Sequence, residues 1–457
     1  MLLSSSVVIK LPSPVLGILQ ILDSHGFETC LVGGCVRDIL SAILQKRSIL
    51  PKDWDIATSA TPNKVLEIFS RYDSYFKVIP IGIQHGTLRI LPLLCENAQV
   101  IEITTYRIEG KYSDKRKPDS VFFTTDLRKD LARRDFRMNA IACSLKNHEI
   151  FALDNPQEYY HCAMQIRDYY GGIRSLQQRQ IVCVGNPAQR FEEDALRIMR
   201  ALRFSAVLEP HFCIEFHTQE ALRMYKDNLC SIAKERIQSE YNAMLLGDYI
   251  TDIALCYREV FAVIYPEILS LSSAQYQVNM SALQYAPFVL SVRLAIFFHS
   301  LSKEDVAAAL KRMRYDKKTL SHTLALVALQ QDSLPLTRMA IKEMLFRVGE
   351  VIFTQYIQVH IALAKAQNAE VLVQSLSEIE TIYRDIIERR ECFLLGDLTI
   401  TGDDIVTMLR EKQIFDKRQV GAVLQQVLYF AMSENLCCNV DSRSMLLMKA
   451  QGIVDSL

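Results

Sequence analysis

The chain has 457 residues, of which 50% are hydrophobic and 23% charged, a composition typical of globular proteins with an extensive core and not of disordered ones. At a usual domain size of ~150 residues, this length indicates two to four domains. The 52 basic residues balance 52 acidic ones, so any nucleic-acid binding must depend on local basic patches. The twelve cysteines are scattered, and no apolar run reaches the ~20 residues of a membrane span. We therefore expect a cytoplasmic protein with reduced thiols and no membrane segment.

Apolar patterning divides the chain into a mixed first part and a helical second part. Helical spacing and short β-branched runs predict helices over 14–26 and 61–72, and strands over 27–34, 76–82, 86–94, 99–107 and 120–125. From about Pro187 onward the spacing is almost entirely helical, beginning with one continuous helix over 190–208. The expected fold class is α+β, with an N-terminal mixed α/β domain that contains a small β-sheet and an all-α remainder.

Two acidic residues in KDWDIATSATP are spaced so that they can hold a metal ion. Asp53 and Asp55 are two positions apart, and residues i and i+2 of a strand point to the same face of its sheet. Two neighbouring carboxylates repel each other, and a divalent cation between them would relieve that repulsion. Mg²⁺ prefers oxygen ligands, and a pair of such ions can align an attacking hydroxyl with a leaving pyrophosphate. Taken alone, this spacing is more often a pair of solvated charges.

A segment that suits phosphate binding precedes the acidic pair. In LVGGCVRD, residues 31–38, we expect a strand to end at Val32, a glycine turn to follow and a helix to begin. Backbone amides at such a turn can approach phosphate oxygens closely, and Arg37 can grip a triphosphate. A Gly-Gly pair alone predicts only a tight turn. Close to a potential metal site, it indicates a nucleotide-binding site.

These two motifs resemble the nucleotidyltransferase head of the polymerase β superfamily, in the class II branch of CCA-adding tRNA nucleotidyltransferases and bacterial poly(A) polymerases. The resemblance covers residues 30–205 densely and continues through IGIQHGTLRI, IEITTYRIEGKYSDKRKPDSV, DLARRDFRMNAIA and GNPAQRFEEDALRIMRALRF. It implies four domains: a head over 1–186, a helical neck with a base-selecting motif over 187–250, a helical body over 251–350 and a helical, tRNA-binding tail over 351–457.

The resemblance also implies roles for individual residues. Asp53 and Asp55 resemble the catalytic carboxylates of the family, which bind the metal ion. The resemblance implies that this ion is Mg²⁺. The nucleotide-binding residues of the family are similar, in chain order, to Gly34, Arg37, Arg134, Asp135, Asp194, Arg197, Arg200 and Arg203. In this comparison Asp135 contacts the sugar or a neighbouring arginine, and Asp194 and Arg197 read the incoming base.

Hydrogen-bonding chemistry gives an independent argument for Asp194 and Arg197. Three positions apart on a helix, their side chains would share a face, where the ordinary interpretation is a salt bridge. Cytosine and adenine each present an amine donor beside a ring-nitrogen acceptor, which a carboxylate and a guanidinium complement. Guanine and uracil present the opposite order. One such pair would therefore admit C and A and reject G and U without a nucleic-acid template.

Three further features bear on which nucleotides are added and on which other residues belong to the site. The basic segment 107–118 resembles a loop that assists A addition in CCA-adding members, which argues against a CC-only enzyme. Glu102 is either a strand-end charge or a third acidic group near the metal. His85 is expected to be a turn residue and not a catalytic base.

We therefore expect an enzyme that adds CCA to tRNA 3′ ends from CTP and ATP and releases pyrophosphate. Its partners would be the tRNA acceptor end, CTP and ATP, without DNA or a membrane. An A-adding-only tRNA nucleotidyltransferase and a poly(A) polymerase share the head motifs and are the alternatives, although VIPIGIQHGT lacks the basic pair usual in poly(A) polymerases. The alternative of another class is a non-catalytic RNA-binding protein, against which two neighbouring carboxylates argue.

Overall fold

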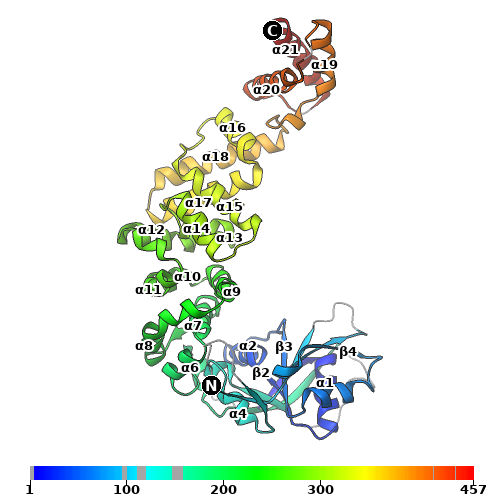
Figure 1. Cartoon of the computed structure of the whole chain (residues 1–457), viewed down its shortest axis with the longest axis vertical. Coiled ribbons are helices and arrows are strands. Elements are labelled where there is room, and N and C mark those ends of the chain that lie inside the picture. The colour runs from blue at the N-terminus through cyan, green and yellow to red at the C-terminus, as the bar shows by residue number, and fades with distance from the viewer. Residues whose placement is uncertain (1–4, 95–99, 111–119, 147–157, 415, 438) are drawn as a thin grey trace. The chain divides into compact units, whose positions relative to one another are not determined.

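The computed structural model describes residues 5–94, 100–110, 120–146, 158–414, 416–437 and 439–457. They form two compact units, Met1–Ile264 and Tyr265–Leu457, whose elements are labelled in Figure 1. A division at this point does not separate a head, neck, body and tail, so the four-part division stays a prediction.

The first unit is built on a mixed sheet of eight strands in the order β1-β10-β9-β2-β3-β6-β5-β4. Its strands are β1 (Ser6–Pro12), β2 (Thr29–Val32), β3 (Trp54–Thr58), β4 (Phe76–Gly82), β5 (Thr87–Pro92), β6 (Ile101–Thr105), β9 (Ala142–Leu145) and β10 (Tyr159–Arg167). β3 and β6 run parallel, and the other neighbours run antiparallel. The predicted strands that became β2, β4, β5 and β6 are confirmed, whereas β1, β9 and β10 were not predicted and enlarge the sheet.

The predicted strand over 120–125 lies outside this sheet. It forms β8 (Val121–Phe123), which pairs antiparallel with β7 (Arg107–Glu109). The rest of the basic segment 107–118, from residue 111 onward, lies outside the described residues.

The middle of the sheet brings the two sequence motifs together. The four residues of β2 are all buried, and helix α2 (Gly33–Leu44) begins at the residue that follows them. In the antiparallel pairing of β2 with β3, Val32 lies opposite Asp55. The end of LVGG and the start of DWDIAT are therefore neighbours because adjacent strands pair at this point.

Helices cover the rest of the first unit. They are α1 (Ser13–Ser24), α3 (Pro62–Phe69), α4 (Leu127–Ala132), α5 (Gly172–Gln178), α6 (Pro187–Glu193), α7 (Leu196–Val207), α8 (Phe216–Tyr225), α9 (Lys234–Leu245), α10 (Ile250–Cys256) and α11 (Arg258–Ile264). The two-residue strands β11 (Gln180–Ile181) and β12 (Cys213–Ile214) pair in parallel.

The continuous helix predicted over 190–208 is wrong, because the chain breaks between α6 and α7. Asp194 has φ −139° and ψ 101°, an extended conformation. Its carboxylate accepts a hydrogen bond from the Leu196 N–H at 3.0 Å, at the start of α7. Aspartate competes in this way with the helical hydrogen bonds of the backbone, a competition that apolar spacing does not reveal.

The second unit is helical, as predicted. Its helices are α12 (Ser273–Ala282), α13 (Leu290–Phe297), α14 (Lys303–Arg312), α15 (Lys317–Ala328), α16 (Arg338–Val348), α17 (Glu350–Ala366), α18 (Glu370–Glu388), α19 (Gly402–Glu411), α20 (Lys417–Ser433) and α21 (Arg443–Asp455). In the part of the chain that the structure describes, no helix has both the length and the apolar character needed to cross a membrane.

A buried ion pair joins α16 to Glu391, which follows α18, and a hydrogen bond joins it to α20. Lys342 of α16 is fully buried, and its Nζ lies 2.6 Å from Glu391 Oε2. The same ammonium donates to the Met432 carbonyl and to Asn435 Oδ1 at the end of α20. Burial alone raises the pKa of Glu391, but hydrogen bonds from Arg338 and Lys342 outweigh it and lower that pKa. Removing one partner would leave the others buried without compensation.

We therefore predict that Lys342→Met lowers the free energy of unfolding by about 3 kcal/mol. Urea unfolding measures the loss, and hydrogen exchange should place it in α16 and α20. The control is Arg347→Met, which breaks an exposed ion pair with Asp332 and should cost less than about 1 kcal/mol. Equal losses in the two variants would contradict the importance of the buried pair.

Candidate active site

An open cavity of about 670 Å³ lies within the first unit. Nine of the ten residues predicted to bind metal or nucleotide line it, and Asp53 is the exception. Its lining arginines are Arg37, Arg107, Arg133, Arg134, Arg197, Arg200, Arg203 and Arg236, and its lining carboxylates are Asp55, Glu109, Asp135 and Asp194. The guanidinium groups of these eight arginines suit contacts with a polyanionic ligand.

The two glycines of LVGG form the start of α2 itself, not a separate turn before the helix. Gly33 has a φ of +73°, a conformation that favours glycine. A Cβ on Gly33 would lie 3.0 Å from Asp55 Oδ2 and 3.4 Å from Arg134 Nη1. The Gly34 N–H belongs to the first turn, where amides lack an intrahelical acceptor, and it donates to Asp55. The helix N-terminus thus holds the Asp55 carboxylate in place.

Arg37 lies one turn further along α2 and is fixed on two sides. Its guanidinium donates to both carboxylate oxygens of Asp38, at 2.7 and 3.0 Å, and to Asn139 Oδ1 at 3.0 Å. The Phe204 ring lies 5.1 Å from its guanidinium carbon. These contacts hold the planar group at the cavity wall, where it can meet a phosphate in two-point geometry.

The acidic pair differs from its predicted arrangement. Asp55 lies on β3, but Asp53 precedes the strand and is exposed. Burial raises the pKa of Asp55 and the charge of Asp53 adds to this, whereas Arg134, Arg37 and the Gly34 amide act in the opposite direction. The net result is a raised pKa, which means that the surroundings disfavour the Asp55 anion.

Glu102 stands next to Asp55 in the sheet. The two residues face each other in the parallel pairing of β3 with β6. Burial, and next the charge of Asp55, raises the pKa of Glu102, and Arg89 at 3.8 Å offsets part of this. A divalent cation would relieve both carboxylates, so the donor set fits a hard ion that binds oxygen. The described residues contain no cluster of three or more side chains suited to hold a metal, and Mg²⁺ commonly completes its shell with water and phosphate.

Asp135 is the most firmly held carboxylate of the cavity. It accepts from Arg200 Nε at 2.7 Å, from Asn139 Nδ2 at 3.1 Å and from the Phe136 N–H at 2.8 Å. Burial acts to raise the pKa of Asp135, but the Arg200 charge and these hydrogen bonds bring it to about 2. Of the two contacts predicted for Asp135, the structure contains the one to an arginine. The preceding Arg134 forms an ion pair with Asp130 at 3.4 Å.

The proposed base readers do not share a helical face, because Asp194 lies in the α6–α7 break. Both nevertheless line the cavity. Arg197 donates to Glu193 Oε2 at 2.8 Å and to the carbonyls of Arg190 and Arg133 at 3.1 and 3.0 Å. Asp194 forms an ion pair with Arg236 of α9 at 3.5 Å. Each of the two residues thus has a partner from another part of the first unit.

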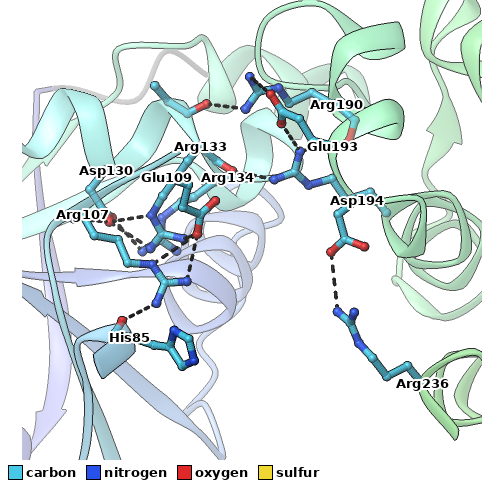
Figure 2. A network of polar contacts seen from close by, with 12 residues as sticks. His85, Arg107, Glu109, Asp130, Arg133, Arg134, Arg190, Glu193, Asp194 and Arg236 are labelled. Atoms are coloured by element: carbon cyan, nitrogen blue, oxygen red, sulfur yellow. Dashed lines mark hydrogen bonds and ion pairs between the residues drawn. The ribbon is translucent and has the colours of Figure 1, made fainter. Parts of the chain in front are cut away.

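Figure 2 shows a polar network that the sequence did not predict. Asp130 lies 2.9 Å from Arg133, and Glu109 lies 3.0 Å from the same arginine. Arg107 of β7 pairs with Glu109 at 2.9 Å and donates to the His85 carbonyl. The sequence signals for these residues were the arginine-rich ARRDF segment and the basic segment 107–118, but the pairing of Glu109 with Arg133 joins residues far apart in the sequence. The His85 ring lines the cavity beside this network.

Arg200 and Arg203 of α7 share an ion-pair partner that the sequence did not predict. Glu240 of α9 lies 3.7 Å from Arg200 and 2.5 Å from Arg203. The Phe204 ring lies 4.2 Å from the Arg203 guanidinium carbon. Glu240 therefore anchors two arginines that line the cavity.

Comparisons with known proteins agree with this geometry. Residues 29–182 match the family described as "Poly A polymerase head domain", and residues 211–271 match the one described as "Probable RNA and SrmB- binding site of polymerase A". The first unit therefore contains a nucleotidyltransferase head domain, and this chain is a nucleotidyltransferase. Nucleotidyltransferases of this kind generally use a divalent metal ion.

The curated relatives narrow the class. The CCA-adding enzyme of Bacillus cereus (strain AH187) is 30% identical over 404 residues, which cover 86% of this chain and 88% of the relative. The CCA-adding enzyme of Anoxybacillus flavithermus is 42% identical over 236 residues, 52% of this chain and 51% of the relative. The chain belongs to the family of CCA-adding enzymes.

Solved structures share the fold. The Bacillus stearothermophilus CCA-adding enzyme in complex with CTP has a TM-score of 0.68 at 23% identity and covers 97% of this chain and 98% of its own. The Thermotoga maritima CCA-adding enzyme complexed with tRNA has a TM-score of 0.59 at 18% identity, with coverage of 98% and 99%.

The crowding at Gly33 leads to a prediction. Gly33→Ala places a methyl group against the Asp55 carboxylate at a positive φ and should lower the free energy of unfolding by about 1–2 kcal/mol. Thermal and urea unfolding measure this change. Gly34→Ala is the matched control, because its Cβ would meet Arg37 Nη2 at an ordinary 3.6 Å, and it should leave stability nearly unchanged. A Gly33 variant as stable as the Gly34 variant would contradict the close approach of α2 to Asp55.

Proposed function

We propose that this protein adds CCA to tRNA 3′ ends in the cytoplasm, using CTP and ATP and releasing pyrophosphate. One observation carries the proposal: a single cavity brings together Asp55, the N-terminus of α2 with Arg37, and the pair Asp194 and Arg197. Those groups suit, in that order, a metal ion, a triphosphate and a nucleobase. The names of the curated relatives support the same reaction.

The metal and phosphate end of the cavity would work through charge. Asp53 and Asp55 would hold Mg²⁺, which when bound supplies positive charge at the reacting phosphate and at the leaving pyrophosphate. Gly34, whose amide donates to Asp55, would lie close to the triphosphate, and Arg37 and Arg134 would neutralise its oxygens. Asp38 and Asn139 hold the Arg37 guanidinium in place, so little reorganisation is needed when the anion binds.

The base end of the cavity would work through hydrogen bonds. Asp194 would accept from the exocyclic amine of cytosine or adenine, and Arg197 would donate to the adjacent ring nitrogen. Glu193 and two backbone carbonyls already fix the Arg197 fork. A rigid donor and acceptor pair rejects uracil and guanine because their edges would leave buried polar groups unpaired.

The helical remainder would hold the RNA. We propose that the neck over 187–250, the body over 251–350 and the tail over 351–457 bind the acceptor arm by its shape and its phosphates. The match of residues 211–271 to a family described as a probable RNA-binding site supports an RNA-binding role for the helices that follow the head.

The direct test uses one tRNA transcript in three lengths, ending at the discriminator base, after C and after CC. Each is incubated with Mg²⁺ and one nucleoside triphosphate, then with CTP and ATP together, and products are resolved at single-nucleotide length. Ordered addition of C, C and A followed by a stop is the expected result. Growth only from the CC end with ATP would indicate an A-adding enzyme, long A tails a poly(A) polymerase, and no extension a non-catalytic RNA-binding protein.

In the same assay, Asp53→Ala and Asp55→Ala should each lower incorporation by more than about a hundredfold, because the charge that would hold the metal ion is lost. Binding of tRNA, measured by filter retention, should stay close to that of the unmodified protein. Asp73→Ala removes another exposed carboxylate of the first unit and is the control. Full turnover by either active-site variant would contradict the metal assignment.

A further inference from the structure

Asp194 occupies a joint where no regular element fixes its side chain. Its N–H donates to the Arg190 carbonyl at 3.2 Å and ends α6. Its Oδ1 accepts from the Leu196 N–H at 3.0 Å and begins α7. Asp194 therefore lies on a two-residue link between two helices. In the proposed function it presents a carboxylate oxygen to the base. The capping hydrogen bond holds Oδ1, so a further contact is needed to orient Oδ2.

Arg236 supplies such a contact from α9. Its Nη2 lies 3.5 Å from Asp194 Oδ2, and both residues line the cavity. The two side chains point toward each other across it (Figure 2). At 3.5 Å the contact is an ion pair and is longer than a typical N–H···O hydrogen bond. A carboxylate oxygen has more than one acceptor site, so Oδ2 can still accept from an amine.

The same face of α9 also contacts α7 further along that helix. Glu240, four residues after Arg236 and hence on the same helical face, pairs with Arg200 and Arg203. One face of α9 thus presents a cation to Asp194 and an anion to the arginines of α7. A single neighbouring helix, α9, therefore contacts both the link that carries Asp194 and the helix that carries Arg197.

We propose that Arg236 is a positioning residue for base selection, which holds the Asp194 carboxylate where it accepts the exocyclic amine of cytosine or adenine. The inference rests on the proposed function. Arg236 is 34% exposed and Asp194 17% exposed, and ion pairs at such sites contribute little to global stability. Loss of Arg236 should therefore affect the choice of nucleotide much more than the fold.

The test compares kcat/KM for CTP and UTP on the tRNA transcripts. Arg236→Met removes the charge and keeps an apolar stem, and it should reduce the preference for CTP over UTP by about tenfold. Arg236→Lys keeps the charge and should retain most of the preference. The control is Arg223→Met on α8, which breaks an exposed ion pair with Glu259 away from the cavity and should leave the ratio unchanged. Thermal unfolding should be similar for all three variants.

An equal fall of kcat/KM for both nucleotides in Arg236→Met would overturn the inference, since it would indicate a phosphate contact or a purely structural role. So would an unchanged ratio in a protein that adds CCA normally, a result that leaves the proposed function intact. No extension by the unmodified protein would overturn the proposed function and the inference with it.

A double-variant cycle tests whether Arg236 acts through Asp194. Asp194→Asn should itself reduce the CTP preference, and adding Arg236→Met should then reduce it no further. If the two losses multiply, Arg236 does not act through Asp194 and the inference is overturned.

Discussion

The constraint on which the site depends is the crowding of eight guanidinium groups around one cavity. Like charges at such distances repel, and they stay together because carboxylates that are buried or half-buried are shared between them. Asp130 pairs with Arg133 and Arg134, and Glu240 with Arg200 and Arg203. Each shared carboxylate fixes the geometry of two arginines but neutralises only one of them.

The charges around the cavity also differ from place to place. At one end, burial works against the anion of Asp55, where a cation fits. At the other end, the Arg200 charge and hydrogen bonds overcome the effect of burial and keep Asp135 ionised. A metal-bound triphosphate matches this polarity, because its cation would meet the carboxylates of the sheet and its oxygens the arginines.

Much of this arrangement follows from the sequence, because local patterns determined it. The strand–glycine–helix segment of LVGGCVRD and the residues that became β4, β5 and β6 could be recognised from periodicity and turn chemistry. Asp55, Arg37 and Arg197 were placed in one site before the fold was known, and they line one cavity. Their individual roles stay predictions.

The features that the sequence did not reveal depend on residues far apart in the chain or on a single side chain. β10 was missed even though buried and less buried residues alternate along it, because it is completed by pairing with β1 and β9 far away in the chain. The break at Asp194 follows from one capping hydrogen bond inside an otherwise helical pattern. Glu240 and Arg236 contact the site from α9, and no local motif marks which residues such a helix will face.

The proposed function requires that the protein itself selects the nucleotide, without a nucleic-acid template. The most direct measurement is the binding of CTP, ATP, UTP and GTP in the presence of Mg²⁺ and in the absence of RNA, by isothermal titration calorimetry. Without an acceptor strand no transfer occurs, so the affinities report the cavity alone. We expect CTP and ATP to bind at least about tenfold more tightly than UTP and GTP. Equal affinities for all four would contradict it.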